Sequence, residues 1–416
     1  MLTLESFRKT VHDHVLADIY ARARGLYGRH IVHVNATYQG GGVAEILYSL
    51  VLLMNDVGID TGWRILHGSQ EFFETTKGFH NALQGRKFNL SKEHKRLYMQ
   101  VNENYAKFTH LDHDCIIVHD PQPLGLIAFY KKRQPWIWRC HIDLTSPHEE
   151  LWDWLKGFMI KYDRVVVSNE KYVKAQLPVN QKVIFPAINP LTPKNREMVS
   201  KTMLRIIKKA GIPTDKPVIT QVSRLDPWKD PEGVIDVFRL VREKVDCRLV
   251  LCYNVATDDP EALTMYHKVM KKASGLTKNH DVLLVVGNNE MLVNAIQRFS
   301  AVVIQKSIRE GFCLAVTEAL WKGTPVVASN VGGIPLQVED DKTGFLLEPD
   351  DNKGFADRLV YLLKHQREAD RLGRNGKEHV RRNFLITRLL SDYLDMLNEI
   401  LTRRSRTAQE HCDTKS

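Results

Sequence analysis

The 416-residue sequence lacks any apolar run close to the ~20 residues that a membrane-spanning helix needs. The longest apolar stretch, residues 46–54, is short and is interrupted by polar side chains. The first nine residues carry acidic and basic groups with no apolar core after them, so a secretory signal is not expected. We therefore expect a cytoplasmic protein that has no membrane partner.

Closely spaced cysteines are also absent. The six cysteines are scattered along the chain without a CxxC pair, and no HExxH sequence occurs. A disulfide framework and a structural zinc site both need tighter spacing than this. We interpret the cysteines as reduced core residues and expect no metal site.

Charge of one sign does not gather in a block. Lysine and arginine number 59 against 49 aspartates and glutamates, which gives a net charge of +10. This sum is compatible with a nucleic-acid partner, an anionic small substrate or a solvated surface. The densest cluster, Arg403, Arg404 and Arg406, lies in a polar C-terminal tail. No stretch interleaves basic and aromatic residues as nucleic-acid-binding modules do, so we expect no nucleic-acid partner.

The apolar residues, 43% of the chain, occur in short runs that alternate with helical segments. Runs of four to six apolar, largely β-branched residues predict strands buried on both faces, as in a parallel sheet covered by helices. The predicted strands are 30–35, 61–66, 114–119, 135–141, 164–168, 217–223, 248–253, 282–286, 301–305 and 325–328. The predicted helices are 44–54, 231–244, 259–273, 290–299, 314–321, 355–365 and 385–401.

A proline-rich break divides this pattern into two α/β halves. Residues 185–193 (FPAINPLTP) hold three prolines in nine positions, which predicts a stiff linker. We expect one doubly wound domain over residues 1–188 and another over 189–384, followed by a C-terminal helix and a disordered tail within 385–416. Ligands of open α/β sheets bind beyond the carboxyl ends of the strands. A site is therefore expected in a cleft between the two halves.

A glycine triplet, Gly40 to Gly42, precedes the predicted helix 44–54. Adjacent glycines at a helix N-terminus suit a nest for phosphate or sugar oxygens, but they also suit a tight strand-to-helix turn. The spacing is neither GxGxxG nor that of a Walker A loop. Both interpretations stay open at this point.

Two cations follow the first strand of the second half, in the sequence SRLDPWKD. Arg224 and Lys229 are five residues apart across a turn, so both can face a ligand. A guanidinium together with an ammonium suits a diphosphate. The alternative is a pair of solvated charges in a surface loop.

Two glutamates eight residues apart mark the next strand-to-helix junction. Glu310 precedes a glycine in the loop, whereas Glu318 lies on an otherwise apolar helix. A buried carboxylate needs hydrogen-bond donors, and the two hydroxyls of a ribose provide them. The amides of residues 312–314 can face an anion. The alternative is a capping acid followed by an exposed glutamate.

His141 follows a predicted strand of the first half and can reach a sugar hydroxyl from there. The alternative is a partly buried histidine with a structural hydrogen bond. His119 and Asp120 give a weaker signal of the same kind. Gly332 and Gly333 follow a strand of the second half and indicate a close approach of the backbone or a turn.

Taken together, these motifs resemble the retaining GT-B glycosyltransferases of glycosyltransferase family 4. The matching segments are QGGGVAE, RCHIDL, SRLDPWKD, REGFCLAVTEAL, GTPVVASNVGGIPLQV and DDKTGFLLEP, in the order that this family shows. The segments VNATYQGGGVAEIL, VHDPQPL, WRCHIDLTSP and FPAINPL look like the branch of trehalose glycosyltransferring synthases and trehalose phosphorylases. Cys313 stands where the family often has glycine.

The resemblance implies a GT-B fold, with two Rossmann-like domains facing each other across a cleft and a C-terminal helix packed back on the first. That helix also suits a homodimer contact. The implied catalytic residues are His141 at the donor sugar O6, Arg224 and Lys229 at the diphosphate, and Glu310 near the sugar O3. The implied donor-binding residues are Gly41, Gly42, Arg224, Lys229, Glu310, Gly311, Phe312, Cys313, Leu314 and Glu318. Acceptor contacts are expected from Asp120, Gln122 and Asp143.

The activity implied by the resemblance is reversible transfer of glucose from UDP- or ADP-glucose to free glucose, which forms α,α-trehalose with retained configuration. No cofactor is required, and any Mg²⁺ is incidental, because arginine and lysine can take the place of a metal at the diphosphate. One alternative is a trehalose phosphorylase, in which phosphate replaces the nucleotide. Others are a sugar epimerase of the same fold and, from a different class, a nucleic-acid-binding protein.

Overall fold

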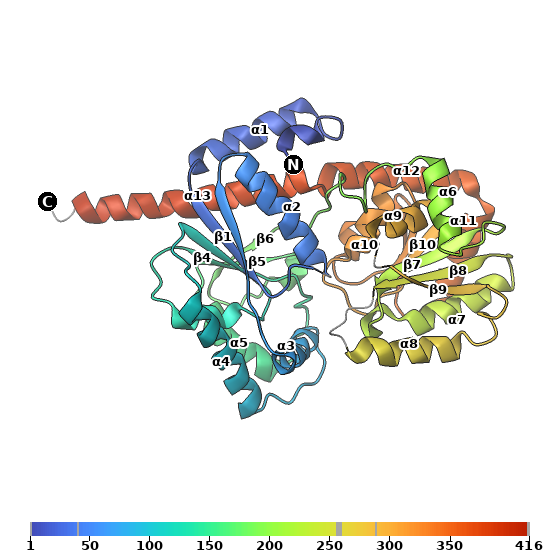
Figure 1. Ribbon diagram of the computed structural model, residues 1–416, viewed down its shortest axis with the longest axis horizontal. Coiled ribbons are helices and arrows are strands. Elements are labelled where there is room, and N and C mark those ends of the chain that lie inside the picture. The colour runs from blue at the N-terminus through green and yellow to red at the C-terminus, as the bar shows by residue number, and fades with distance from the viewer. Residues whose placement is uncertain (1, 40, 255–259, 288, 414–416) are drawn as a thin grey trace. The chain divides into compact units, whose positions relative to one another are not determined.

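The computed structural model describes residues 2–39, 41–254, 260–287 and 289–413, and the chain forms two compact units (Figure 1). The first unit consists of Met1–Ala187 together with Ile386–Ser416. The second unit consists of Ile188–Leu385. Each unit is built around its own six-stranded sheet.

The first unit contains a parallel sheet in the order β2-β1-β3-β4-β5-β6. Its strands are β1 His30–Asn35, β2 Asp60–Ile65, β3 Cys115–His119, β4 Trp136–Arg139, β5 Arg164–Val167 and β6 Asn180–Val183. The strand order reverses between β1 and β3, which makes their carboxyl ends the switch point where such sheets bind ligands.

Within the described residues of this unit, six α-helices and four short 3₁₀ turns accompany the sheet. The α-helices are α1 Asp13–Ala23, α2 Gly42–Asp56, α3 Gln70–Leu83, α4 Lys92–Phe108, α5 Glu149–Met159 and α13 Ile386–Asp413. The 3₁₀ turns are η1 Leu4–Phe7, η2 Arg24–Leu26, η3 Leu124–Phe129 and η4 Glu170–Tyr172.

Helix α13 packs on α1 and α2, so the end of the chain returns to the first unit. The helix is longer than the predicted 385–401, because it continues to Asp413. The expectation of a disordered tail is therefore wrong for residues 402–413, which contain no glycine or proline that would stop a helix. Residues 414–416 lie outside the described residues.

The second unit contains a parallel sheet in the order β12-β11-β10-β7-β8-β9, with its switch point between β7 and β10. Its strands are β7 Val218–Arg224, β8 Arg248–Asn254, β9 Val282–Val286, β10 Val302–Gln305, β11 Val326–Ser329 and β12 Gly344–Leu347. Its helices are α6 Ser200–Lys209, α7 Pro231–Arg242, α8 Pro260–Lys272, α9 Glu290–Phe299, α10 Leu314–Trp321, α11 Asn352–Lys364 and α12 Gln366–Asn383. Two 3₁₀ turns, η5 Pro227–Lys229 and η6 Ile334–Leu336, complete the unit.

Strand β8 shows why apolar runs without alternation predicted strands buried on both faces. Leu249 and Leu251 belong to a hydrophobic cluster on one face of the sheet. Val250 and Cys252 belong to a separate cluster on the other face. A strand with apolar layers on both sides needs no polar positions, and this confirms the predicted parallel α/β architecture.

The edge strands β6 and β12 were not among the strands predicted from the sequence. Residues 180–183 read NQKV and are only partly buried, because β6 has a neighbour on one side alone. Strand β12 reads GFLL, and its Gly344 lies so close to β11 that a Cβ would stand 2.5 Å from the Val326 carbonyl oxygen. The weak apolar pattern of β6 explains its omission.

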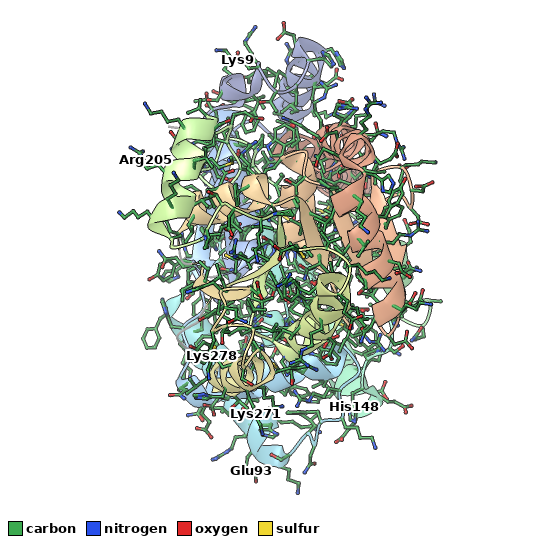
Figure 2. All side chains as sticks on the ribbon, turned by 90° about the vertical axis from the view of Figure 1, so that its right-hand side faces the viewer. Lys9, Glu93, His148, Arg205, Lys271 and Lys278 are labelled. Carbon is green, nitrogen blue, oxygen red and sulfur yellow. The ribbon has the colours of Figure 1, made fainter. Side chains whose placement is uncertain are left out.

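Several basic side chains on different elements point outward. Figure 2 shows Lys9 beside the N-terminal helices, Arg205 on α6 and Lys271 on α8, each directed outward. Among the described helices, none combines the length and the apolar character that crossing a membrane requires.

Replacement of glycine by alanine should have opposite effects on stability at two helical glycines. A Cβ added at Gly373 would lie 2.0 Å from the carbonyl oxygen of Gly323, so Gly373→Ala should destabilise the second unit by about 2 kcal/mol or more. A Cβ at Gly157 in α5 would meet nothing within 4 Å, so Gly157→Ala should stabilise the first unit by about 0.5–1 kcal/mol. Denaturant unfolding of both variants checks this pair, and shifts of the same sign would contradict it.

Candidate functional site

The donor-site residues predicted in the second unit lie at the carboxyl ends of β7 and β10, which form the switch point of the sheet. Arg224 is the last residue of β7, and Lys229 ends the 3₁₀ turn that follows. Glu310 lies in the loop between β10 and α10. Because β7 and β10 are paired in parallel, the β7–α7 loop (225–230) and the β10–α10 loop (306–313) leave the same edge of the sheet.

Two ion pairs join these loops. Lys229 Nζ contacts Glu310 Oε2, and Lys306 Nζ contacts Asp230 Oδ2. A backbone hydrogen bond of 2.8 Å also connects the loops. The hydroxyl of Ser307 donates to the same Glu310 oxygen at 3.2 Å. The predicted phosphate ligand Lys229 and the predicted sugar ligand Glu310 are therefore direct neighbours.

The two cations of this site differ in their surroundings. Burial opposes the charge of Lys229, but the Glu310 carboxylate outweighs burial and raises the pKa of Lys229 above its ordinary value. Lys229 is therefore a fixed cation. Arg224 Nη2 lies 3.3 Å from Asp226 Oδ2, and the Arg224 side chain is 40% exposed. The guanidinium is accessible to an anion.

The N-terminus of α10 stands at this edge, with Cys313 as its N-cap. Cys313 has φ 74°, a left-handed conformation that favours glycine and explains the glycine that the related motif often carries there. A third loop, after β11, closes on this turn. A Cβ on its Gly333 would lie 2.8 Å from the Gly311 carbonyl oxygen, and Gln337 donates to the carbonyl of Phe312. The predicted segment 311–314 is thus held against the loop that follows β11.

Glu318 is buried within α10, with 1% of the residue exposed. The ammonium of Lys194 lies 2.9 Å from its Oε1. This ion pair rules out the alternative of an exposed glutamate. Lys194 lies one residue beyond the predicted linker 185–193 and gave no local signal, because its contact with Glu318 depends on the fold.

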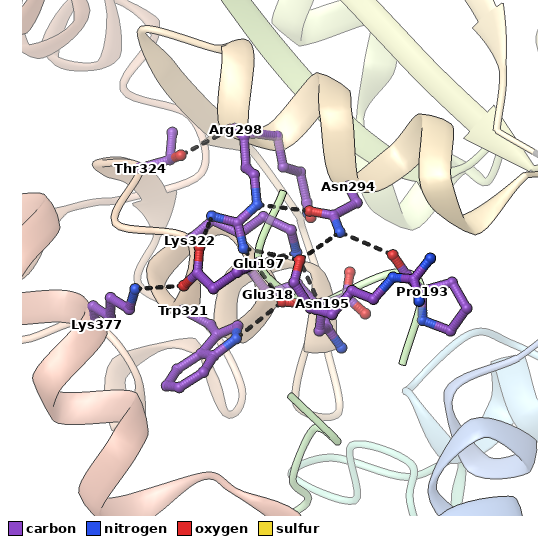
Figure 3. Close-up of polar contacts among 12 residues, drawn as sticks. Pro193, Asn195, Glu197, Asn294, Arg298, Glu318, Trp321, Lys322, Thr324 and Lys377 are labelled. Atoms are coloured by element: carbon purple, nitrogen blue, oxygen red, sulfur yellow. Dashed lines mark hydrogen bonds and ion pairs between the residues drawn. The ribbon is translucent and has the colours of Figure 1, made fainter. Parts of the chain in front are cut away.

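The segment 193–197, which begins where the predicted linker 185–193 ends, is bound to the second unit (Figure 3). The Asn195 carbonyl accepts from Trp321 Nε1 at 3.1 Å, and Asn195 Oδ1 accepts from Lys322 Nζ at 3.0 Å. Asn294 Nδ2 donates to the Pro193 carbonyl at 2.8 Å. Burial lowers the pKa of Lys322 to about 7. These contacts place Lys194 beside Glu318.

The glycine loop of the first unit lies between β1 and α2. Gly40 lies outside the described residues. Gly41 has an extended backbone with φ −158°, and a Cβ there would meet nothing within 4 Å. Neither conformation nor packing therefore requires glycine at position 41. Gly42 is the first residue of α2. A ligand approach at Gly41 and Gly42 stays a prediction.

His141 and Asp120 follow the neighbouring strands β4 and β3. The backbone N–H of His141 donates to Asp120 Oδ1 at 2.8 Å, and Trp138 Nε1 donates to the Asp120 carbonyl at 2.9 Å. Asp120 has a left-handed backbone with φ 61°. Burial raises the pKa of Asp120 to about 6, and burial lowers the pKa of His141 well below its ordinary value. His141 is therefore a neutral imidazole.

The remaining predicted acceptor residues show local contacts. Asp143 is buried, and its Oδ1 accepts from the Thr145 N–H at 2.7 Å and the Thr145 hydroxyl at 2.5 Å. The Gln122 carbonyl accepts from Asn102 Nδ2 at 3.1 Å. These contacts stabilise the loops after β3 and β4, and acceptor binding by Asp143 and Gln122 stays a prediction.

Comparison with known proteins identifies the class that this fold and these loops define. The family model "Trehalose synthase, N-terminal domain" matches residues 33–174, and the model "Glycosyl transferases group 1" matches residues 203–379. The solved structure of an α,α-trehalose-phosphate synthase (UDP-forming) from Burkholderia vietnamiensis matches with a TM-score of 0.73 at 16% identity, over 90% of this chain and all of that one. The protein is a glycosyltransferase with the GT-B fold.

Closer relatives define the branch. The trehalose synthase of Thermococcus litoralis is 46% identical over 402 residues, which cover 95% of this chain and 96% of that protein. The trehalose phosphorylase of Grifola frondosa is 28% identical over 91% of this chain but only 58% of its own length. The chain belongs to the trehalose synthase family.

Proposed function

We propose that this protein transfers glucose from a nucleoside diphosphate glucose to free glucose and so forms α,α-trehalose. The observation that carries the proposal is the Arg224 and Lys229 pair at the switch point of the second unit, in a chain related to trehalose synthases over 95% of its length. A synthase is favoured over a phosphorylase, because the related phosphorylase is less similar to this chain than the related synthase is. The chain also covers only 58% of the length of that phosphorylase. The buried carboxylate of Glu318 also suits a ribose, which a phosphorylase would not bind.

Electrostatics support the reaction. Cleavage of the sugar–phosphate bond develops positive charge at the anomeric carbon and negative charge on the diphosphate. Arg224, Lys229 and the amides at the start of α10 supply positive potential for the diphosphate. Each such group lowers the barrier by roughly 3 kcal/mol, which is about a hundredfold in rate.

The α configuration is retained in this proposal through attack on the same face of an oxocarbenium-like centre, so no protein nucleophile is needed. His141 contacts the donor sugar O6 and Glu310 contacts the sugar near O3, as the resemblance implies. Glu310 is already oriented for this by Lys229 and Ser307. Closure of the site on its substrates keeps water from the reactive centre.

Metal is not required in this proposal, because fixed cations carry the charge that Mg²⁺ would supply, and any bound Mg²⁺ is incidental. Neither nucleic acid nor a membrane is a partner. The five cysteines with described side chains are buried and unpaired, which supports the cytoplasmic setting expected from the sequence. A homodimer is compatible with this function.

A product assay tests the proposal. Purified protein with UDP- or ADP-glucose and free glucose should yield trehalose, and excess EDTA should leave the rate unchanged. Reverse reactions with trehalose should proceed with UDP or ADP and not with phosphate. Absence of trehalose from all donors would refute the proposed substrates, whereas nucleotide release without added glucose would indicate the epimerase alternative.

Glu318 and Lys194 form a matched pair for testing the ribose contact. Glu318→Gln should weaken nucleotide binding about tenfold or more, because a charged carboxylate accepts hydroxyl donors better than an amide. Lys194→Met should lower the unfolding temperature, since it leaves a buried carboxylate without its counter-ion, yet change nucleotide affinity little. Calorimetry with UDP and ADP measures both affinities. Unchanged nucleotide binding by Glu318→Gln would count against the ribose role.

A further inference from the structure

Three histidines of the first unit form a continuous chain, His33, His119 and His141, which we call the histidine chain. His33 lies on β1, His119 ends β3, and His141 comes two residues after β4. In the register of the sheet, His33 is opposite Ile117 and His119 is opposite Arg139. Each step of the chain therefore moves one strand sideways and two residues toward the carboxyl edge. Since residues two apart share a face, all three imidazoles lie on the same side of the sheet.

Hydrogen bonds join the three rings. His33 Nδ1 lies 2.9 Å from His119 Nε2, and His119 Nδ1 lies 3.1 Å from His141 Nε2. Among the described residues, His33 Nε2 is buried and has no hydrogen-bond partner. The ring of Tyr393 from α13 covers this inner end, with its centroid 6.0 Å from that of His33. The outer end of the histidine chain is the half-buried His141.

All three imidazoles are neutral. Burial lowers the pKa of His33 to about 3 and lowers the pKa values of His119 and His141 well below their ordinary range. The neighbouring Arg139 guanidinium adds to this effect at His119 and His141. Arg139 is itself buried and donates to the carbonyls of Val167 and Ile184 at 2.9 and 2.7 Å.

Neutrality leaves only two proton arrangements. A neutral imidazole carries one N–H, so His119 can donate to only one neighbour and must accept from the other. The hydrogen bonds of the chain must therefore all point outward from His33 or all point inward. The inward order places an N–H on His33 Nε2, where it would be buried without an acceptor. Orphaned buried N–H groups are rare in folded proteins, so the outward order is favoured.

We infer that His33 and His119 are positioning residues that fix the tautomer of His141, so that its Nδ1 carries the hydrogen and offers a donor to a substrate oxygen. This inference deepens the proposed function, because the oxygen it addresses is a hydroxyl of the transferred sugar. The histidine chain determines which nitrogen of His141 can donate. The Asp120 carboxylate fixes the backbone of His141, because its Oδ1 accepts from the His141 N–H at 2.8 Å. A single histidine without these partners would exchange between its two tautomers.

Nitrogen-15 spectra of protein labelled at histidine test the inference directly. Two-bond ¹H–¹⁵N correlations should show His141 protonated at Nδ1, whereas histidines in water favour hydrogen on Nε2. His119→Leu should restore the ordinary pattern at His141, because it removes the N–H that donates to His141 Nε2. His113→Phe, which changes a half-buried histidine outside the chain, should leave the His141 signals unchanged.

Kinetics give the second readout. His119→Leu should lower kcat/KM for the sugar donor about five- to tenfold through loss of one oriented hydrogen bond, with an unchanged KM for glucose. His119→Asn, which keeps an N–H near the Nδ1 position, should recover most of this loss. Hydrogen on Nε2 of His141 in the unmodified protein, or a His119→Leu spectrum that shows no change at His141, would overturn the inference. Both spectra can be read even if the proposed reaction is wrong.

Discussion

The ion pairs between the loops after β7 and β10 are the interaction on which the site of the second unit depends. Lys229 with Glu310 and Lys306 with Asp230 hold the two loops together at the switch point of the sheet. The first pair also keeps a candidate phosphate ligand charged, because the Glu310 carboxylate raises the pKa of Lys229. Without these contacts, two lysines and two carboxylates would be separate surface charges of little value.

The two units differ in the charge state of the side chains at the switch points of their sheets. At the switch point of the second unit, charges are kept and paired, which suits the binding and release of a diphosphate. At the switch point of the first unit, burial and Arg139 keep His119 and His141 neutral. Neutral donors suit sugar hydroxyls, whose recognition depends on the direction of hydrogen bonds more than on charge.

The sequence predicted the central strands, the parallel architecture and the loops that carry the candidate residues, because buried parallel strands and strand-to-helix turns leave local patterns. It did not reveal β6, β12 or the role of residues 193–197. Strand β6 is only partly apolar, and Lys194 reaches Glu318 across more than a hundred residues of sequence. The histidine chain was equally hidden, since it depends on the register of three strands. Cys313 was recognised as an exception, but its left-handed backbone could only come from the structure.

The most direct test of the account is the turnover of Arg224→Met combined with Lys229→Met, measured with saturating donor and compared with Lys278→Met as a control on an exposed lysine. If these cations stabilise the departing diphosphate, kcat of the double variant should fall by a factor of about a hundred or more, while KM for glucose changes little. The control should retain its activity. A double variant that keeps kcat within about threefold of the unmodified protein would contradict the account.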